Sequence, residues 1–429
     1  MKKSLVALAA LAVSGAAMAQ ATIYGRSDIA YGVKTTSLAQ GAMNTKQTGI
    51  MDGANAGSRI GFRGTEDLGG GMKAHFVTEQ GISPTNGALF GVRAATAGTQ
   101  YDGYAASTGQ FDVGSAGSYS QGTNRQTYLG LEGGFGTLRV GYQYTTLYEI
   151  ATLSGFTNTS EGMAGGNVAH LWGNGAAGGT RANGIAYISP KLAGAWTVGL
   201  QMGSGAGRES TEWGTAATNT ASTRTLDKQS RTSLHVDYNS GPLRAALGYT
   251  TYNVDLSGTT AGAATTVPVA STVNTFSVLG ALTSAGAAAV AGNTTYTTNL
   301  TQLAGSYNFG MLKAGLTINS GAKTATSGPA TGTAANTLAA GTYNFASRAL
   351  SVNMPMGKME LVGGMGNSSL DSAGTVLADW ATSQVGVKYN FSKRTVMYGY
   401  TGTATDNNAT AATAFKQMTG TAIGIDHQF

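Results

Sequence analysis

The sequence predicts an all-β fold: a sixteen-stranded antiparallel transmembrane β-barrel with long external loops and short periplasmic turns. Three observations lead to this prediction. Apolar and polar residues alternate with period two in many short segments. Charged residues make up only 11% of the chain, against about 25% in soluble proteins. The segments are joined by very short turns in some places and by long stretches rich in Gly, Ala, Ser and Thr in others.

The N-terminus has the three parts of a secretory signal peptide. Basic residues come first, an apolar run covers 5–13, and Ala17-Met18-Ala19 supplies the small residues of a cleavage site. We therefore expect residues 1–19 to be removed and residues 20–429 to form the barrel. The apolar run is too short for a membrane-spanning helix, which needs ~20 apolar residues, and no later segment has that character.

Individual strands are indicated by apolar residues at every second position. In Arg59-Ile60-Gly61-Phe62-Arg63 the two arginines share one face, and Ile60 and Phe62 share the other. Period two places one set of side chains in lipid and the other in water. The expected strands cover 22–33, 57–64, 72–80, 126–132, 135–144, 183–189, 195–203, 231–239, 242–252, 300–309, 311–319, 347–354, 357–365, 382–391, 394–402 and 420–429.

The connections divide into two kinds. Turns such as Gly133-Gly134 and Pro355-Met356-Gly357 are short. The segment 271–281 could add a strand, but we assign it to a loop because the even number of strands already closes a barrel. A barrel this wide leaves an aqueous channel. The expected long loops cover 81–124, 145–181, 204–229, 253–299, 320–345 and 403–416.

Two sets of side chains follow from the expected faces. Tyr31, Tyr249, Tyr398 and Tyr400, at strand ends, are expected in the aromatic girdle. Charges should face the lumen, because each one on the lipid face at mid-barrel would cost ~2–4 kcal/mol. The expected lumen bases are Arg26, Arg59, Arg63, Lys73, Arg139, Arg244, Lys313, Lys358 and Lys388, and the acids are Asp28, Glu79, Asp237, Glu360 and Asp426.

Four segments carry a family resemblance: Ala21-Thr22-Ile23-Tyr24-Gly25, then 58–69 (Ser-Arg-Ile-Gly-Phe-Arg-Gly-Thr-Glu-Asp-Leu-Gly), 128–138 and 423–429. With these segments the chain resembles the trimeric general-diffusion porins of Gram-negative bacteria, especially the beta-proteobacterial type. The resemblance covers the strands of the mature chain and fails in the loops. It implies a homotrimer in the outer membrane, in contact with lipid and lipopolysaccharide, that passes small hydrophilic solutes and ions.

The resemblance also implies a pore constriction, in which the loop 145–181 folds inward and a basic barrel wall faces acids on that loop. Arg26, Arg59 and Arg181 match basic positions of the family. Tyr142 stands where the family usually has Arg, and the loop lacks the usual Pro-Glu-Phe-Gly turn. The candidate constriction residues are Arg26, Arg59, Arg63, Glu79, Arg139, Tyr142, Glu149, Glu161 and Arg181. Bases outnumber acids, so we expect a weak to moderate preference for anions.

Signals for other functions are weak. The GxGxxG pattern at 173–178 lies in a Gly-rich loop without a strand–helix context, and no GxSxG pattern occurs. The chain has no cysteine, and its four histidines have no zinc spacing. We expect no enzyme activity, cofactor, metal or nucleic-acid partner. A barrel enzyme and an adhesin are weaker hypotheses, and a solute-specific porin stays open beside a general one.

The signal peptide gives a first prediction. Protein extracted from the outer membrane should begin at Gln20, because a signal peptidase recognises the small residues at Ala17 and Ala19. N-terminal sequencing measures this directly. A chain that began at Met1, or beyond Ala30, would contradict the expected cleavage.

Overall fold

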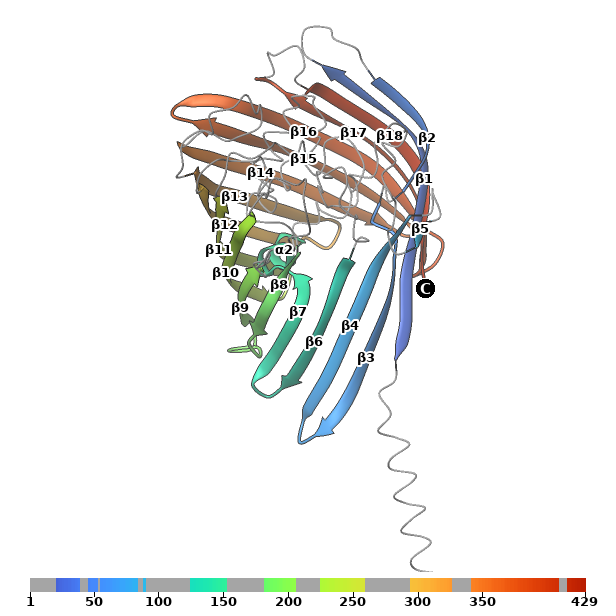
Figure 1. The fold of residues 1–429 in the computed structure, drawn as a ribbon. Helices are drawn as coiled ribbons and strands as arrows, with labels where there is room; N and C mark the ends of the chain where they lie inside the picture. The colour runs from blue at the N-terminus through green and yellow to red at the C-terminus, as the bar shows by residue number, and fades with distance from the viewer. Residues whose placement is uncertain are drawn as a thin grey trace, which may run out of the picture.

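The computed structural model describes residues 21–38, 45–52, 55–83, 88–89, 124–152, 181–205, 224–258, 294–325, 341–408 and 415–429. Within these ranges the chain forms a closed antiparallel β-barrel, which confirms the expected fold class (Figure 1). The expected signal peptide, the segment 271–281 and the loop residues 153–180, which include Glu161, lie outside the described residues.

The strands follow one another around the barrel in chain order, and each one is antiparallel to its neighbours. They are β1 (Thr22–Leu38), β2 (Thr45–Asp52), β3 (Arg59–Gly69), β4 (Met72–Ser83), β5 (Ala88–Leu89), β6 (Asn124–Gly133), β7 (Gly136–Tyr144), β8 (Arg181–Ile188), β9 (Trp196–Gly205), β10 (Arg224–Ser240), β11 (Leu243–Gly258), β12 (Thr294–Asn308), β13 (Lys313–Ala325), β14 (Gly341–Met356), β15 (Met359–Ser372), β16 (Thr375–Asn390), β17 (Thr395–Asp406) and β18 (Phe415–Gln428).

The 18 strands of the described residues form a wall of sixteen. β2 and β3 both pair with β1, at successive heights, and together make one wall strand. β5 has two residues and pairs with the end of β4. β18 pairs with β1 from Arg26↔Gln428 to Leu38↔Phe415, which closes the barrel. The number of wall strands therefore agrees with the sequence prediction.

Short turns at one end of the barrel have the glycines that their backbone needs. Gly69, Gly70 and Gly71, between β3 and β4, have φ values of 77°, 62° and 79°. Glycine occupies this left-handed region at no steric cost, whereas other residues are disfavoured there. The short turns expected from the sequence are thus confirmed at this end of the barrel.

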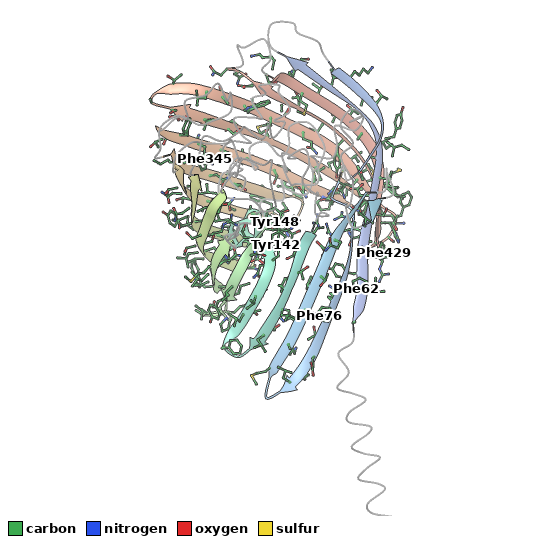
Figure 2. The ribbon with its side chains drawn as sticks, in the orientation of Figure 1. Phe62, Phe76, Tyr142, Tyr148, Phe345 and Phe429 are labelled. Atoms are coloured by element: carbon green, nitrogen blue, oxygen red, sulfur yellow. The ribbon has the colours of Figure 1, made fainter. Side chains whose placement is uncertain are left out.

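The alternation of the two faces is also confirmed. On β14, Ser347, Ala349 and Ser351 are buried on the inner side, whereas the residues between them are exposed. Leu350 and Val352 on the same strand carry the apolar outer face. Figure 2 shows side chains projecting from both faces of the wall, with Phe345 on this strand labelled. Period two therefore separates a lipid face from a polar interior.

Several strands extend well beyond their expected ends. We expected 347–354, 357–365 and 382–391, but β14 and β16 have 16 residues each and β15 has 14. β15 and β16 meet in a tight turn at Ala373 and Gly374, where φ is 49° and 80°. In the added part of β14, Thr342 and Asn344 point outward while Tyr343 and Phe345 point inward, so the apolar outward residues that mark a strand in lipid are missing there.

The expected aromatic girdle is correct for two tyrosines and wrong for two. Tyr31 and Tyr249 are exposed on the outer face, whereas Tyr398 and Tyr400 are buried inside the barrel. Tyr398 lies over Gly424 and Tyr400 over Gly386, where an added Cβ would come within 2.4 Å of the Tyr398 Oη and 1.9 Å of the Tyr400 Cδ1. The neighbouring strands thus provide flat glycine sites that hold these rings on the inner wall.

The lipid face gives a second prediction, tested by a matched pair of substitutions on β9. Leu200→Arg would place a charge on the outer face, where Leu200 is exposed beside Tyr187 and Leu234. We expect it to lower the free energy of unfolding by roughly 2–4 kcal/mol. Thr197→Arg would place the same charge on the inner face, opposite Asp237, and should cost much less.

The measurement is urea unfolding in lipid vesicles, followed by the mobility of folded and unfolded protein on a gel. Equal destabilisation by the two substitutions would contradict the assignment of the two faces of β9.

Candidate pore constriction

A short helix follows β7 and lies inside the barrel. α2 (Thr146–Ala151) has Thr145 as its N-cap, whose side chain accepts a hydrogen bond from the Tyr148 backbone N–H. Leu147 and Ile150 are buried against the inner face of β9–β12. They reach Gly248 on β11, where an added Cβ would come within 2.4 Å of Leu147 and 2.6 Å of Ile150. The start of the expected loop 145–181 therefore points inward.

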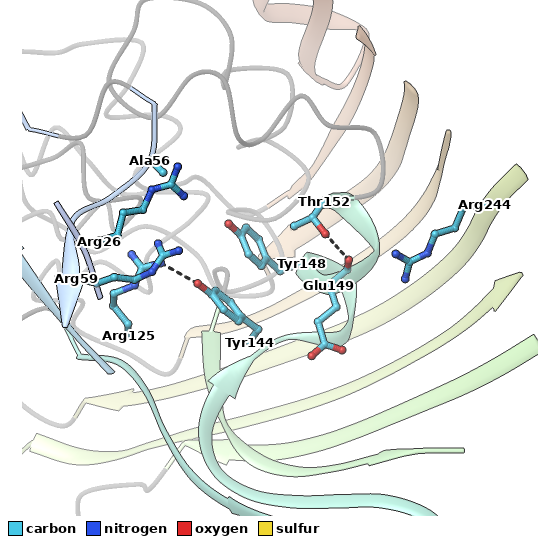
Figure 3. Close-up of a pocket in the computed structure, with 9 residues that line it drawn as sticks. All are labelled: Arg26, Ala56, Arg59, Arg125, Tyr144, Tyr148, Glu149, Thr152 and Arg244. Atoms are coloured by element: carbon cyan, nitrogen blue, oxygen red, sulfur yellow. Dashed lines mark hydrogen bonds between the residues drawn. The ribbon is translucent and has the colours of Figure 1, made fainter. Parts of the chain in front are cut away.

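The helix and the opposite wall enclose a cavity of about 320 Å³. Figure 3 shows Arg26, Arg59 and Arg125 on one side and Tyr148 and Glu149 of α2 across from them. The complete lining among the described residues is Arg26, Ala56, Arg59, Arg125, Tyr144, Tyr148, Glu149, Thr152 and Arg244. Four arginines and one glutamate thus face the water in this part of the lumen.

Two buried carboxylates bind the arginines of the wall. Asp426 on β18 accepts hydrogen bonds from Nε and Nη2 of Arg26. Glu79 on β4 accepts from Nε of Arg125 at 2.6 Å and lies 3.5 Å from Nε of Arg59. Glu79 also accepts from the Tyr24 hydroxyl at 3.2 Å. One carboxylate is therefore shared by two guanidinium groups.

The other side of the cavity has two further ion pairs. Arg139 on β7 binds Glu149 of α2 at 2.9 Å, so the helix is tied to the barrel wall. Arg244 on β11 binds Asp237 on β10 at 2.9 Å. Both pairs are hydrogen-bonded as well as ionic, which makes them stronger than neutral hydrogen bonds.

The arginines stand on the water side of these pairs. Arg26 is 18% exposed and Asp426 is 1% exposed. The values are 25% for Arg59 against 6% for Glu79, and 44% for Arg244 against 10% for Asp237. An ion in the lumen therefore meets guanidinium groups first, with the neutralising carboxylates behind them. Two pairs differ: Glu149, which comes from the helix, is more exposed than its partner Arg139, and Arg125 is as buried as Glu79.

Tyr144 connects the helix to the basic wall. Its hydroxyl accepts hydrogen bonds from Arg125 at 2.9 Å and from Arg181 at 3.1 Å. Its ring stacks on Tyr148, with the centroids 4.7 Å apart, and lies under the Arg181 guanidinium at 4.6 Å. These contacts hold the start of α2 close to the arginines.

The structure brings together most of the site residues expected from the sequence. Arg26, Arg59 and Glu149 line the cavity. Three more do not line the cavity but contact residues that do: Glu79 contacts Arg59, Arg139 contacts Glu149, and Arg181 contacts Tyr144.

Three expected residues are not part of this arrangement. Arg63 lies four residues from Arg59 on β3, where it stacks over Tyr24 at 5.1 Å, and is not among the residues that line the cavity. Tyr142 is likewise absent from the described lining. Glu161 lies outside the described residues.

Arg125 is the functional candidate that the sequence analysis missed. Simple alternation would place it outward with Leu129, which is exposed. A β-bulge reverses its direction, because Glu79 pairs with Gln126 while Gln80 pairs with Asn124. The wall thus has an arginine from β6, on the strand next to the position where Tyr142 replaces the basic residue usual in the family. Ala56, Tyr144, Tyr148 and Thr152 were also missed, because each lies beside or beyond a strand end.

The described residues contain no group of three or more His, Cys, Asp or Glu side chains placed to hold a metal ion. In the same part of the chain, no helix is long and apolar enough to cross a membrane.

Comparisons with known sequences agree with this geometry. The family described as "Gram-negative porin" matches residues 4–410. The major outer membrane protein P.IB of Neisseria meningitidis serogroup B is 34% identical over 218 residues, 49% of this chain and 53% of that protein. Outer membrane porin protein 32 of Delftia acidovorans is 32% identical over 254 residues, 58% of this chain and 59% of that protein. The chain thus spans little more than half the length of the curated relatives it matches.

Solved structures show the same fold. An anion-selective porin from Comamonas acidovorans matches with a TM-score of 0.63 and 20% identity, covering 96% of this chain and 100% of that one. Outer-membrane expressed OmpT of Vibrio cholerae matches with a TM-score of 0.56 and 13% identity, covering 95% and 97%. Because the family match extends over nearly the whole sequence and the described strands close into the same barrel, the chain belongs to the Gram-negative porin family and is an outer-membrane β-barrel.

Proposed function

We propose that the protein is a passive diffusion channel for small hydrophilic solutes and ions, with a weak to moderate preference for anions. The cavity inside the barrel is lined mainly by polar and charged side chains, whereas the outer face carries exposed apolar residues such as Leu129 and Leu350. The cavity between α2 and the arginine wall is the proposed constriction. The loop 145–181 is proposed to continue the narrowing that α2 begins.

The proposed anion preference rests on which member of each ion pair in the wall is more exposed to the lumen. At Arg26, Arg59 and Arg244 the guanidinium group is the more exposed member of its ion pair. Charges at a constriction set the local ion concentration, and their influence decays over a Debye length of ~8–10 Å. The buried carboxylates reduce the positive potential without reversing it, which is why the preference is weak to moderate.

The chemistry of the interior favours a channel over a barrel enzyme. A hydrolase of this shape would need a histidine between a nucleophile and an orienting acid. His75 instead packs edge-on against Tyr128, and His427 bonds to Thr395 on the outer face. His235 is buried with its ring over Gly199, and its Nδ1 has no hydrogen bond to an acid or a nucleophile. The proposal therefore assigns the arginines and Glu149 to ion selection, and assigns no residue to catalysis.

The third prediction concerns assembly. We propose a homotrimer in contact with outer-membrane lipid and lipopolysaccharide, since the family resemblance implies three barrels side by side. Mass measurement of the protein in a mild detergent should give three times the chain mass. A mass of one chain under conditions that keep the barrel folded would contradict it.

The fourth prediction tests ion preference at Arg59. The zero-current potential across a tenfold KCl gradient should have the sign of chloride preference in the parent channel. Arg59→Ala should lower the ratio of chloride to potassium permeability by about twofold, or ~0.4 kcal/mol where tenfold is ~1.4 kcal/mol, because Arg125 then neutralises Glu79 alone. Clear cation preference in the parent would refute the sign.

A control variant separates the constriction from the rest of the lumen. Lys313→Ala removes an expected lumen base at the first residue of β13, outside the residues that line the cavity. Its zero-current potential should change less than that of Arg59→Ala, because charges remote from the constriction are screened. Equal shifts of the zero-current potential in the two variants would show that the cavity does not determine the ion preference.

A further inference from the structure

The second wall strand is interrupted at the height of the constriction. β1 pairs with β3 up to Arg26↔Arg59 and with β2 from Ile29↔Asp52 onward. Between these pairs, β1 contributes two residues while the neighbouring wall strand contributes six, 53–58. The surplus chain must therefore leave the plane of the sheet, and its residues 55–58 are described.

Residues 55–58 lie on the inner side of the wall. Asn55, Ala56 and Ser58 are buried, and Ala56 lines the cavity beside Arg26 and Arg59. Figure 3 shows Ala56 and Arg26 across the cavity from α2. We call residues 55–58 the inner segment. It narrows the lumen from the side opposite the helix.

Asp28 holds the backbone of the inner segment. Its Oδ2 accepts hydrogen bonds from the backbone N–H groups of Asn55 at 2.8 Å and Ala56 at 2.6 Å. Its own backbone N–H donates to the Ser58 hydroxyl at 2.8 Å, and its Oδ1 accepts from the Tyr398 hydroxyl. A buried carboxylate with this many donors has a fixed position, so the segment it binds is fixed as well.

Asn55 connects the inner segment to the arginine wall. Its Nδ2 donates to Asp426 at 2.6 Å, and its Oδ1 accepts from the Tyr400 hydroxyl at 2.6 Å. Asp426 is the same carboxylate that binds Arg26. The Asn55 amide therefore orients the acceptor that keeps the Arg26 guanidinium in place. Tyr398 and Tyr400 stack with centroids 5.0 Å apart, which gives the two hydroxyls a rigid support.

We propose that the inner segment is a second constriction element and that Asn55 is a positioning residue for Arg26, acting through Asp426. The inference rests on the proposed channel function, because pore width and ion preference are its readouts. It adds to that function a role for one neutral asparagine, whose two side-chain hydrogen bonds position the first arginine of the constriction and help Asp28 to hold the inner segment in place.

The test is the neutral substitution Asn55→Ala, recorded as single channels in a planar bilayer. Loss of both amide contacts frees Asp426 and weakens the hold on the inner segment, whose backbone stays bonded to Asp28. We expect single-channel conductance to rise by at least about 1.3-fold and the chloride preference to fall. Because the substitution changes no charge, a shifted zero-current potential reports displacement of Arg26 rather than the loss of a charged side chain.

The matched control is Asn353→Ala. Asn353 on β14 donates to the Glu360 carboxylate at 3.0 Å but does not line the cavity. The substitution removes an amide–carboxylate hydrogen bond away from the cavity, so the single-channel conductance and the zero-current potential should equal those of the parent within error. Equal changes in the two variants would show a general loosening of the barrel and overturn the proposal, as would parental values in Asn55→Ala.

A second variant decides the matter if Asn55→Ala does not fold. Tyr400→Phe keeps the ring over Gly386 but removes the hydroxyl that donates to Asn55. It should shift conductance and potential in the same direction by a smaller amount, and parental values would overturn the proposal. A parent protein that forms no pores would instead refute the channel function itself, so the two failures are distinguishable.

Discussion

Every backbone N–H and C=O group inside the hydrocarbon layer needs a partner within the protein, because no water is present there to replace it. The antiparallel ladder satisfies this requirement around the whole wall, including the β18–β1 junction that closes it. Closure then fixes which way each side chain points. Polar residues at alternate positions are directed into a water-filled interior, and apolar residues such as Leu129 and Leu350 are directed to lipid.

The polar interior allows charges that the lipid face would exclude, but it also requires that they be balanced. Each arginine that lines the cavity is bonded to a carboxylate: Arg26 to Asp426, Arg244 to Asp237, and Arg59 and Arg125 both to Glu79. At Arg26, Arg59 and Arg244 the carboxylate lies deeper than the guanidinium group, whereas Arg125 is as buried as Glu79. The wall can therefore be balanced in charge and still present a positive surface to the pore, because at these three pairs the arginine lies nearer the water than its carboxylate.

Two departures from a regular barrel bring the constriction together. The β-bulge at Arg125 directs its side chain inward toward Glu79. The surplus residues between β2 and β3 form an inner segment bonded to Asp28, with Ala56 on the cavity. A regular ladder at either place would leave Arg125 facing lipid and the wall flat. The irregular sites thus lie at the height of the cavity, and α2 packs against the opposite wall at Gly248.

The sequence by itself determined the fold, because period-two alternation and short glycine turns report directly on a sheet with one face in lipid. It also determined that Arg26, Arg59 and Glu79 face the lumen, since parity follows from the ladder. Only the tertiary structure decided that Arg125 points inward, that Tyr398 and Tyr400 bind Asp28 and Asn55, and that the extended β14–β16 hairpins continue past the apolar band. These features depend on bulges, glycine sites and contacts between residues up to 400 positions apart, such as Arg26 and Asp426. Local alternation contains no information about such pairs, because they are set by closure of the barrel.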